Sequence, residues 1–288
     1  MSKVIKLKKG LDIKLKGEAE NLVKNIERCD FYAVKPTDFR LLTPKLVVKA
    51  GDQVKAGDVL FIDKYRPEVK FTSPVSGTVE TVNRGERRKL LEVVVKADAE
   101  IQYKDFGAAD VNKLSRDEII EKLLDSGVWP MIKQRPYDIV ASPADEPRDI
   151  FVSAFYSAPL APNFDFVVKG QEVDFQTGLD ALAKLTDGKV YVGIRKGSSV
   201  SVKGVETVEV EGPHPAANVG VQINHIKPIN KGEVVWTVNP ADVIVIGRLF
   251  NKGIADFSRL VVITGSETTE RGYVKAIAGC TIASLVDG

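Results

Sequence analysis

The sequence predicts a multidomain α/β protein, in which a small β-barrel is followed by a Rossmann-like α/β layer. The first observation behind this prediction is that residues 45–82 hold only short β-type runs, separated by Gly-Asp pairs and prolines. Strands with such punctuation favour a small barrel or sandwich. The second observation is that the hydrophobic pattern changes after Asp98 from the two-residue period of strands to the helical period. Helices and strands are therefore expected to alternate in the second part of the chain.

Residues 1–29 are expected to form an N-terminal arm or hairpin. Between Val4 and Lys16, apolar residues alternate with lysines on both sides of Gly10, which is the pattern of two short strands. The stretch from Glu18 to Cys29 is expected to hold one helical turn at most. A turn-rich loop at residues 35–40 then leads into the barrel.

The barrel is expected to span residues 30–98. Short β-type runs lie at residues 46–49, 53–56, 59–62, 69–72, 78–83 and 89–96. A polar turn at residues 84–88 joins the last two runs and contains Gly85. We expect a positive φ at this glycine, because it has no Cβ to oppose that conformation.

The α/β layer is expected to span residues 99–256. Its first helix should run from Arg116 to Ser126, since Ser115 and Glu118 make a capping box and Gly127 stands just past the end. Strands are predicted at 148–154, 189–195, 205–210 and 233–238, and helices at 171–186, 215–226 and from Pro240 to Gly253. The unit from 148 to 195 is strand–helix–strand, which predicts parallel strands with a right-handed crossover. Runs at 260–265 and 273–278 predict a β-hairpin.

The composition argues against several classes of function. The net charge of +2 offers no positive footprint for nucleic acid. No apolar run approaches the ~20 residues of a membrane span, and no signal peptide is evident, so a cytoplasmic soluble protein is expected. Cys29 and Cys280 are the only cysteines, too few for an iron–sulfur cluster. His214 and His225 have no further ligand at zinc spacing, so no metal site is expected.

Two phrases within the barrel resemble lipoyl or biotinyl carrier domains, whose fold is a barrel-sandwich hybrid. They are V-x-x-G-D-x-V-x-x-G-D-x-L-F at residues 48–61 and S-P-V-S-G-T-V at residues 73–79. In such carriers the acceptor lysine stands at a hairpin tip between the two phrases. Here the only Asp-Lys pair, Asp63-Lys64, comes early in that interval. A covalent carrier that uses Lys64 is therefore an alternative function.

Longer sequence segments, which occur in the same order as in the family, resemble the A subunit of the sodium-translocating NADH:quinone oxidoreductases. They are LFIDK, FTSPVSGTV and NRGERRKLLEVVV in the first half, and GPHPAANVGVQINHI and DVIVIGRLFNKG in the second. The resemblance implies a peripheral subunit on the cytoplasmic side of the bacterial inner membrane, with the B to F subunits of the complex as partners. It also implies a chain truncated at its C-terminus, in which residues 257–288 start a β-grasp domain.

The same resemblance implies that this chain carries no redox cofactor, while NADH, flavins and quinone are used by the whole respiratory complex. The sequence agrees, because the loops after the strands at 148–154 and 189–195 lack the G-x-G-x-x-G motif that cradles a dinucleotide. The isolated chain is then expected to be non-catalytic and to support assembly, with quinone interaction as a further hypothesis. Another alternative is a flavoprotein similar to the C subunit of the related Rnf electron-transport complex.

Three segments, at residues 127–136, 155–166 and 212–215, hold the side chains expected to contact a quinone. A planar apolar ring suits aromatic walls with one or two polar donors. The candidates are Trp129, Met131, Lys133, Arg135, Phe155, Tyr156, Phe164, Phe166 and His214. Purely structural explanations stay open for them: a connector between domains, an aromatic loop packed on its own domain, and a histidine at a helix start. No catalytic acid, base or nucleophile is assigned.

Overall fold

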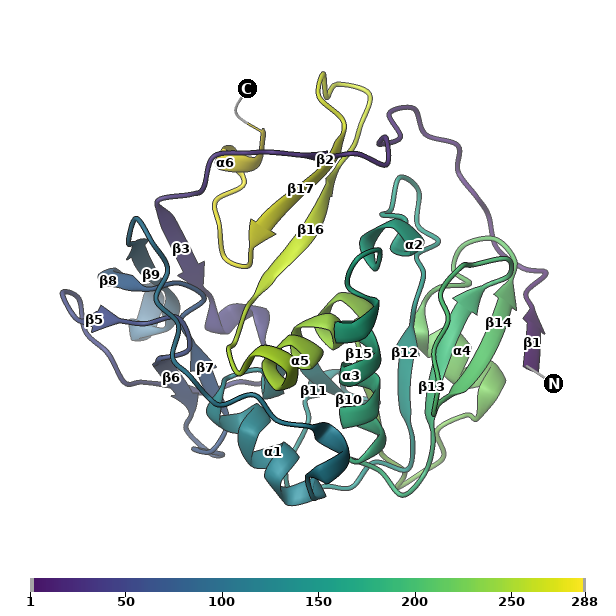
Figure 1. The fold of residues 1–288 in the computed structure, drawn as a ribbon, viewed down its shortest axis with the longest axis horizontal. Coiled ribbons are helices and arrows are strands. Elements are labelled where there is room, and N and C mark those ends of the chain that lie inside the picture. Colours follow the sequence, from purple (N-terminus) through teal and green to yellow (C-terminus); the bar gives the residue numbers. More distant parts are fainter. Residues whose placement is uncertain (1–2, 287–288) are drawn as a thin grey trace.

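The computed structural model describes residues 3–286, and a seven-stranded sheet forms its centre (Figure 1). In spatial order its strands are β1 (Lys3–Lys6), β14 (Glu206–Glu211), β13 (Val190–Arg195), β12 (Ile150–Ser153), β15 (Val235–Val238), β10 (Ile132–Arg135) and β11 (Ile139–Val140). The first five strands are mutually parallel, as the strand–helix–strand pattern predicted for β12 and β13. The last two add an antiparallel edge.

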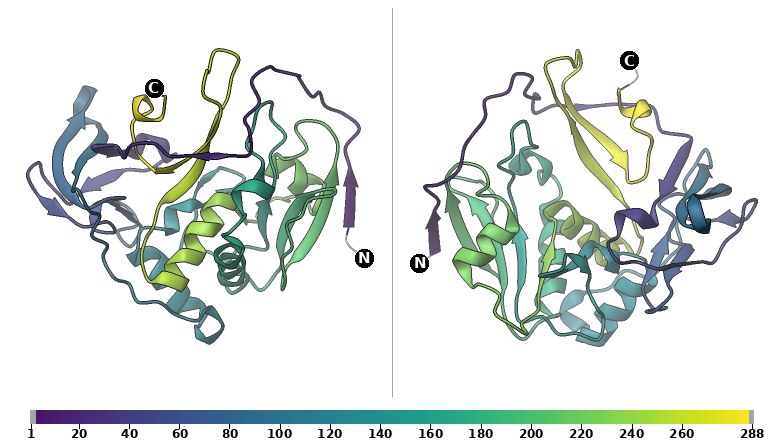
Figure 2. Two further views of the ribbon diagram at one scale, coloured as in Figure 1. Left: turned by 45° about the horizontal axis from the view of Figure 1, so that its top comes forward. Right: turned by 180° about the vertical axis from the view of Figure 1, so that it is seen from behind.

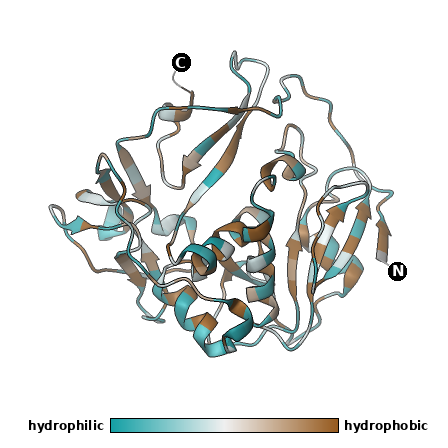
Figure 3. Cartoon of the chain, viewed as in Figure 1, coloured by the Kyte–Doolittle hydropathy of each residue, from teal (hydrophilic) through white to brown (hydrophobic). Residues whose placement is uncertain are grey.

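Helices cover both faces of this sheet (Figures 1 and 2). α3 (Glu172–Ala183) and α5 (Pro240–Lys252) lie on one face, and α4 (Val219–Ile226) lies on the other. The side chains of β12 alternate accordingly: Ile150 and Val152 belong to the main core, whereas Phe151 packs with Ile223 of α4. Such a strand is apolar throughout because both of its faces are buried. Figure 3 shows the resulting hydrophobic stretches along the central strands.

The caps confirm two helix predictions. At the start of α1 (Arg116–Asp125), the Ser115 hydroxyl accepts a hydrogen bond from the Glu118 backbone N–H, and the Glu118 carboxylate accepts one from the Ser115 N–H. α5 is capped by Asn239, whose side chain accepts a hydrogen bond from the Ala241 N–H at 3.0 Å. It ends at Gly253 in the left-handed conformation. These ends are set locally, which is why the sequence predicted them.

Two small sheets form the barrel, so the predicted fold class, a barrel-sandwich hybrid joined to an α/β layer, is confirmed. One sheet contains β3 (Phe31–Val34), β9 (Leu90–Ala97), β8 (Gly77–Arg84) and β5 (Gln53–Val54). The other contains β4 (Pro44–Leu46), β6 (Val59–Asp63) and β7 (Lys70–Thr72). Phe61 and Phe71 stack in the barrel core with ring centroids 4.8 Å apart. The positive φ expected at Gly85 is wrong: Gly85 is extended, and Arg87 and Arg88 take the left-handed conformation instead.

Residues 3–29 form neither a hairpin nor a helical turn. Only β1 is a strand in its first part, and it pairs in parallel with β14 at the edge of the central sheet. The chain then crosses the molecule to the barrel (Figure 2). On the way, β2 (Val23–Lys24) pairs in parallel with β17 (Gly272–Ile277). The predicted strand before Gly10 is confirmed as β1, whereas the predicted strand after Gly10 is wrong, because residues 11–16 form no strand. The partners of β1 and β2 are both distant in sequence.

The predicted C-terminal hairpin is confirmed, since β16 (Ser258–Ile263) and β17 pair antiparallel. With β2 they make a three-stranded sheet. The assignment of this sheet to a β-grasp domain stays a prediction. The remaining helices are α2 (Phe164–Val167) and α6 (Ala283–Val286), and short 3₁₀ turns lie at Pro36–Asp38, Glu86–Arg88, Val111–Lys113 and Trp129–Met131. Within residues 3–286, no helix has the length and apolar character needed to cross a bilayer.

Candidate functional site

The first candidate site lies at the carboxyl ends of β12 and β15. The chain leaves β12 towards β13, whereas it enters β15 from α4 after crossing back from β14. The strand order therefore reverses between these two neighbours, and open α/β sheets bind ligands at such a switch point. A pocket of about 650 Å³ occupies this position. Its walls include Ser153, Thr237 and the first turns of α4 and α5, and we call it the switch-point pocket.

Five of the nine predicted contact residues line the switch-point pocket: Met131, Lys133, Arg135, Phe155 and Tyr156. The first three come from the 3₁₀ turn before β10 and from β10 itself. The other two follow β12 directly, where the Tyr156 hydroxyl donates to the Asn239 side-chain oxygen at 3.3 Å. The segment 127–136 is therefore not a connector between domains but includes a strand of the central sheet. The antiparallel strand β10, which pairs with β15, is what brings its side chains to the switch point.

A second pocket, of about 690 Å³, lies where the barrel, the α/β layer and the C-terminal hairpin meet. We call it the junction pocket. Its aromatic walls are Phe39 and Phe71 from the barrel and Phe257 from the residues before β16. Met131, Lys133 and Asp242 line both pockets. These three side chains thus separate the switch-point pocket from the junction pocket.

Charged groups gather at this boundary. The Asp242 carboxylate lies 3.1 Å from a terminal nitrogen of Arg259, and the Lys133 ammonium lies 4.6 Å from the centre of the Phe39 ring. Burial lowers the pKa of Lys133, although Asp242 and Asp138 act to raise it. Burial raises the pKa of Asp242 in spite of Arg259 and Lys133. A neutral ligand in either pocket would meet Lys133 and Asp242, whose charges are costly to bury.

The comparisons with known proteins identify the family. Residues 5–98 match the model of the NqrA N-terminal barrel-sandwich hybrid domain, and residues 114–255 match that of the NqrA second alpha/beta domain. The chain belongs to the NqrA family. Among its relatives are proteins named as the A subunit of Na(+)-translocating NADH-quinone reductase from Hahella chejuensis, Saccharophagus degradans and Neisseria meningitidis, which are 36%, 36% and 34% identical over 290 residues. Each alignment covers 99% of this chain, which spans 65% of the length of the relative.

One solved structure with a related outline is an NAD+-reducing [NiFe]-hydrogenase in the air-oxidised state. The match has a TM-score of 0.41 and 11% identity, and it covers 65% of this chain and 44% of the hydrogenase chain. A likeness of this degree carries no argument about the function of this NqrA-family chain.

Trp129 and Phe164 were predicted to contact a quinone, but in this NqrA-family chain they line neither the switch-point pocket nor the junction pocket. Both side chains are fully buried. The Trp129 indole packs edge-on against Trp236 with ring centroids 5.4 Å apart and donates to the Ala141 carbonyl at 2.9 Å. Phe164 packs against Phe175 of α3 at 5.3 Å. An aromatic residue with all its surface in the core cannot form the wall of a pocket.

Phe166 and His214 also lie away from both pockets. Phe166 packs on Tyr273 of β17, with ring centroids 4.7 Å apart. His214 was expected at a helix start, but α4 begins only at Val219. Instead, the His214 ring nitrogen shares a hydrogen bond with the Ser157 hydroxyl at 3.1 Å, and its backbone N–H donates to Asp12. His214 thus fastens the N-terminal arm to the α/β layer.

Asp242, Arg259 and Phe39 were missed by the sequence reasoning. A signal did exist for Asp242, because it occupies the first turn of a helix with a recognisable Asn-Pro start that follows a predicted strand. Arg259 and Phe39 carried no such signal, since they reach the junction pocket from different parts of the chain. Among residues 3–286, no three His, Cys, Asp or Glu side chains are grouped so that they could hold a metal ion.

Proposed function

We propose that this chain is the peripheral A subunit of a sodium-translocating NADH:quinone reductase, on the cytoplasmic side of the inner membrane. In this role it supports assembly with the other subunits and contributes to quinone interaction, without a redox cofactor of its own. The names of its relatives, which are 34–36% identical, support the proposal that this chain is a subunit of that complex. The lack of a glycine-rich phosphate loop after β12 and β13 supports the absence of a bound flavin.

The junction pocket is the observation that supports the quinone part of this proposal. A quinone head group is flat and apolar, with a carbonyl oxygen at each end. Phe39, Phe71 and Phe257 offer aromatic walls, and Lys133 and Arg259 offer hydrogen-bond donors. Burying apolar ring surface contributes about 25 cal/mol per Å². Loss of ligand freedom offsets several kcal/mol of this, so the affinity of the isolated chain should be micromolar at best.

The test replaces Lys133 by Met in the whole complex, which removes the donor but keeps most of the apolar stem. We expect the KM for a short-chain quinone to rise about tenfold, equivalent to ~1.4 kcal/mol. The matched control is Lys64→Met, because Lys64 is an exposed lysine of the barrel outside both pockets. An unchanged KM in an assembled Lys133→Met complex would remove quinone contact from the proposal. The assembly role is tested separately, by asking whether the other subunits co-purify when this chain is deleted.

The position of Lys64 speaks against the alternative of a covalent carrier. A carrier lysine has to move freely at a hairpin tip, but the loop that follows β6 is fastened at both sides. The Asp63 carboxylate accepts from Arg66 at 2.9 Å, and Arg66 also donates to the Val140 carbonyl of β11 at 3.0 Å. Arg66 thereby ties this loop of the barrel to the central sheet.

A further inference from the structure

Cys29 and Cys280, which are near opposite ends of the sequence, are brought together by the fold. Cys29 stands just before β3, and Cys280 follows β17. The segment after β17 turns towards the barrel, where Cys280 makes an antiparallel bridge with Tyr32. Next to that bridge, the Ala33 N–H donates to the Gly279 carbonyl at 2.8 Å. The backbone contacts thus fix the two cysteine-bearing segments side by side.

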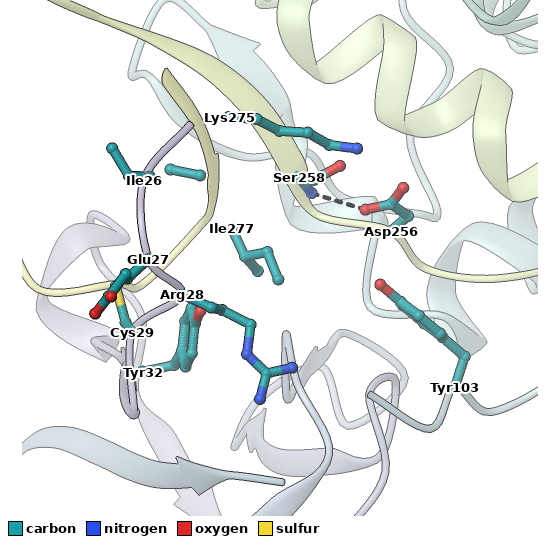
Figure 4. A pocket seen from close by; sticks show the side chains of 11 residues that line it. Ile26, Glu27, Arg28, Cys29, Tyr32, Tyr103, Asp256, Ser258, Lys275 and Ile277 are labelled. Atoms are coloured by element: carbon teal, nitrogen blue, oxygen red, sulfur yellow. Dashed lines mark hydrogen bonds between the residues drawn. The ribbon is translucent and has the colours of Figure 1, made fainter. Parts of the chain in front are cut away.

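The two thiols lie close enough for Cys29 to raise the pKa of Cys280. Cys29 is 7% exposed, and its sulfur also lies 2.6 Å from the Ser284 hydroxyl. In Figure 4 it lies beside Tyr32, at the wall of a small cavity of about 230 Å³. Cys280 is less buried and lines the junction pocket. A small solute that enters the junction pocket can therefore reach Cys280.

We propose that Cys29 and Cys280 are a redox pair that a peroxide converts into an intramolecular disulfide. The Cys280 thiolate attacks one oxygen of hydrogen peroxide, the O–O bond breaks, and one water leaves as Cys280 becomes a sulfenic acid. The Cys29 sulfur then attacks the Cys280 sulfur, so that an S–S bond forms, the S–O bond breaks and a second water leaves. The two sulfurs together lose two electrons, and the peroxide gains them. A dithiol reductant reverses the reaction by thiol exchange.

The surroundings make this reaction slow. Burial and the neighbouring Cys29 raise the pKa of Cys280 to about 11. Little thiolate is then present at neutral pH, and the thiolate is the nucleophile. The pair is thus suited to prolonged oxidising conditions and not to rapid sensing.

The disulfide would have a structural consequence because it closes a loop that contains almost the whole chain. It would fasten residues 278–282, which form one wall of the junction pocket, to the start of the barrel. Closing so long a loop restricts the unfolded chain strongly. The oxidised protein should therefore be more stable and hold its junction pocket more rigidly than the reduced protein.

The test incubates the dilute, folded chain with hydrogen peroxide for several hours and follows intact mass, thiol alkylation and thermal unfolding. We expect the mass to fall by two hydrogen atoms, both alkylatable thiols to disappear and Tm to rise by several degrees. A dithiol should reverse all three changes. Trypsin should release one linked species, which joins the peptides of residues 29–40 and 276–288.

Cys29→Ser and Cys280→Ser are the matched controls, and neither should give the linked peptide or the rise in Tm. The proposal is overturned if both thiols of the wild-type chain stay alkylatable. It is equally overturned if each sulfur gains oxygen without a link, or if links form only between two molecules. These readouts do not involve a quinone, so they are independent of the function proposed above.

Discussion

Asp242 experiences opposing effects at the boundary between the two pockets. Burial disfavours its charged form, whereas Arg259 at 3.1 Å and the nearby Lys133 favour it. The net effect is a raised pKa, so the folded chain binds this proton more tightly than the unfolded chain. Such a group stabilises the folded state fully below the unfolded pKa, and this contribution is lost as the pH rises through the folded pKa.

Replacing Asp242 by Asn should remove this pH dependence. We expect the free energy of unfolding of the wild type to improve relative to the Asn variant as the pH falls from neutral towards 4, since ~3.9 is the ordinary pKa of aspartate. Urea unfolding of both proteins across that range measures the difference. Glu121→Gln, at an exposed position of α1, serves as the control. A wild type that loses stability relative to the variant on acidification would contradict the raised pKa.

The nine predicted contact residues show how far residue types alone can locate a site. Lys133 and Tyr156 were selected because a planar ring suits aromatic walls with one or two polar donors, and both line the switch-point pocket. Trp129, two positions before Met131, has the same kind of aromatic character but points into the core. Aromatic residues serve both core and pocket, and the sequence does not say which neighbours they will have.

The helices α3 and α5 touch backbone to backbone, and two glycines allow it. A Cβ atom on Gly247 would lie only 1.7 Å from the Asp174 carbonyl oxygen, and one on Gly178 only 2.1 Å from that of Val243. Both positions lie inside helices, where glycine is otherwise unfavourable. The close approach that these glycines permit brings α5, and with it Asp242, over the end of β15.

Gly247→Ala should therefore destabilise the chain by about 3 kcal/mol or more, since the added methyl group forces the two helices apart. Gly220→Ala in α4 is the matched control, because nothing lies within 4 Å of a Cβ atom at that position. There the better helix propensity of alanine should leave stability equal or raise it by ~0.5 kcal/mol. Denaturant unfolding compares the two variants. Equal stability of both variants would show that α3 and α5 can accommodate a methyl group at position 247 without loss of stability.

At the scale of the whole molecule, the N-terminal arm links the units. It supplies β1 to the central sheet and β2 to the C-terminal sheet, and it leads directly into β3 of the barrel. The continuous segment of residues 3–34 thus contributes one strand to each of three sheets. Residues 33–35 at the start of the barrel and residues 278–282 after β17 also line the junction pocket. The proposed ligand contact and the proposed disulfide therefore both belong to the assembled chain and not to any one unit.

The purified chain should be colourless and its intact mass should equal the sequence mass. No glycine-rich loop follows β12 to hold a flavin phosphate, and the two cysteines are too few for an iron–sulfur cluster. An absorbance spectrum and a mass spectrum check both statements. A flavin band at stoichiometric occupancy would favour the Rnf-like alternative, and an added lipoyl or biotinyl group on Lys64 would favour the carrier.

Elements with local signals could be predicted before any contact between distant residues was known. The capping box at Ser115, the Asn239–Gly253 helix and the Gly-Asp turns of the barrel are read from neighbouring residues, because caps and turns are satisfied within a few positions. The partners of the N-terminal arm, the burial of Trp129, the place of Lys133 between two pockets and the meeting of Cys29 with Cys280 became visible only in the folded chain. They depend on contacts between residues far apart in the sequence, which are stable only once the whole core has formed.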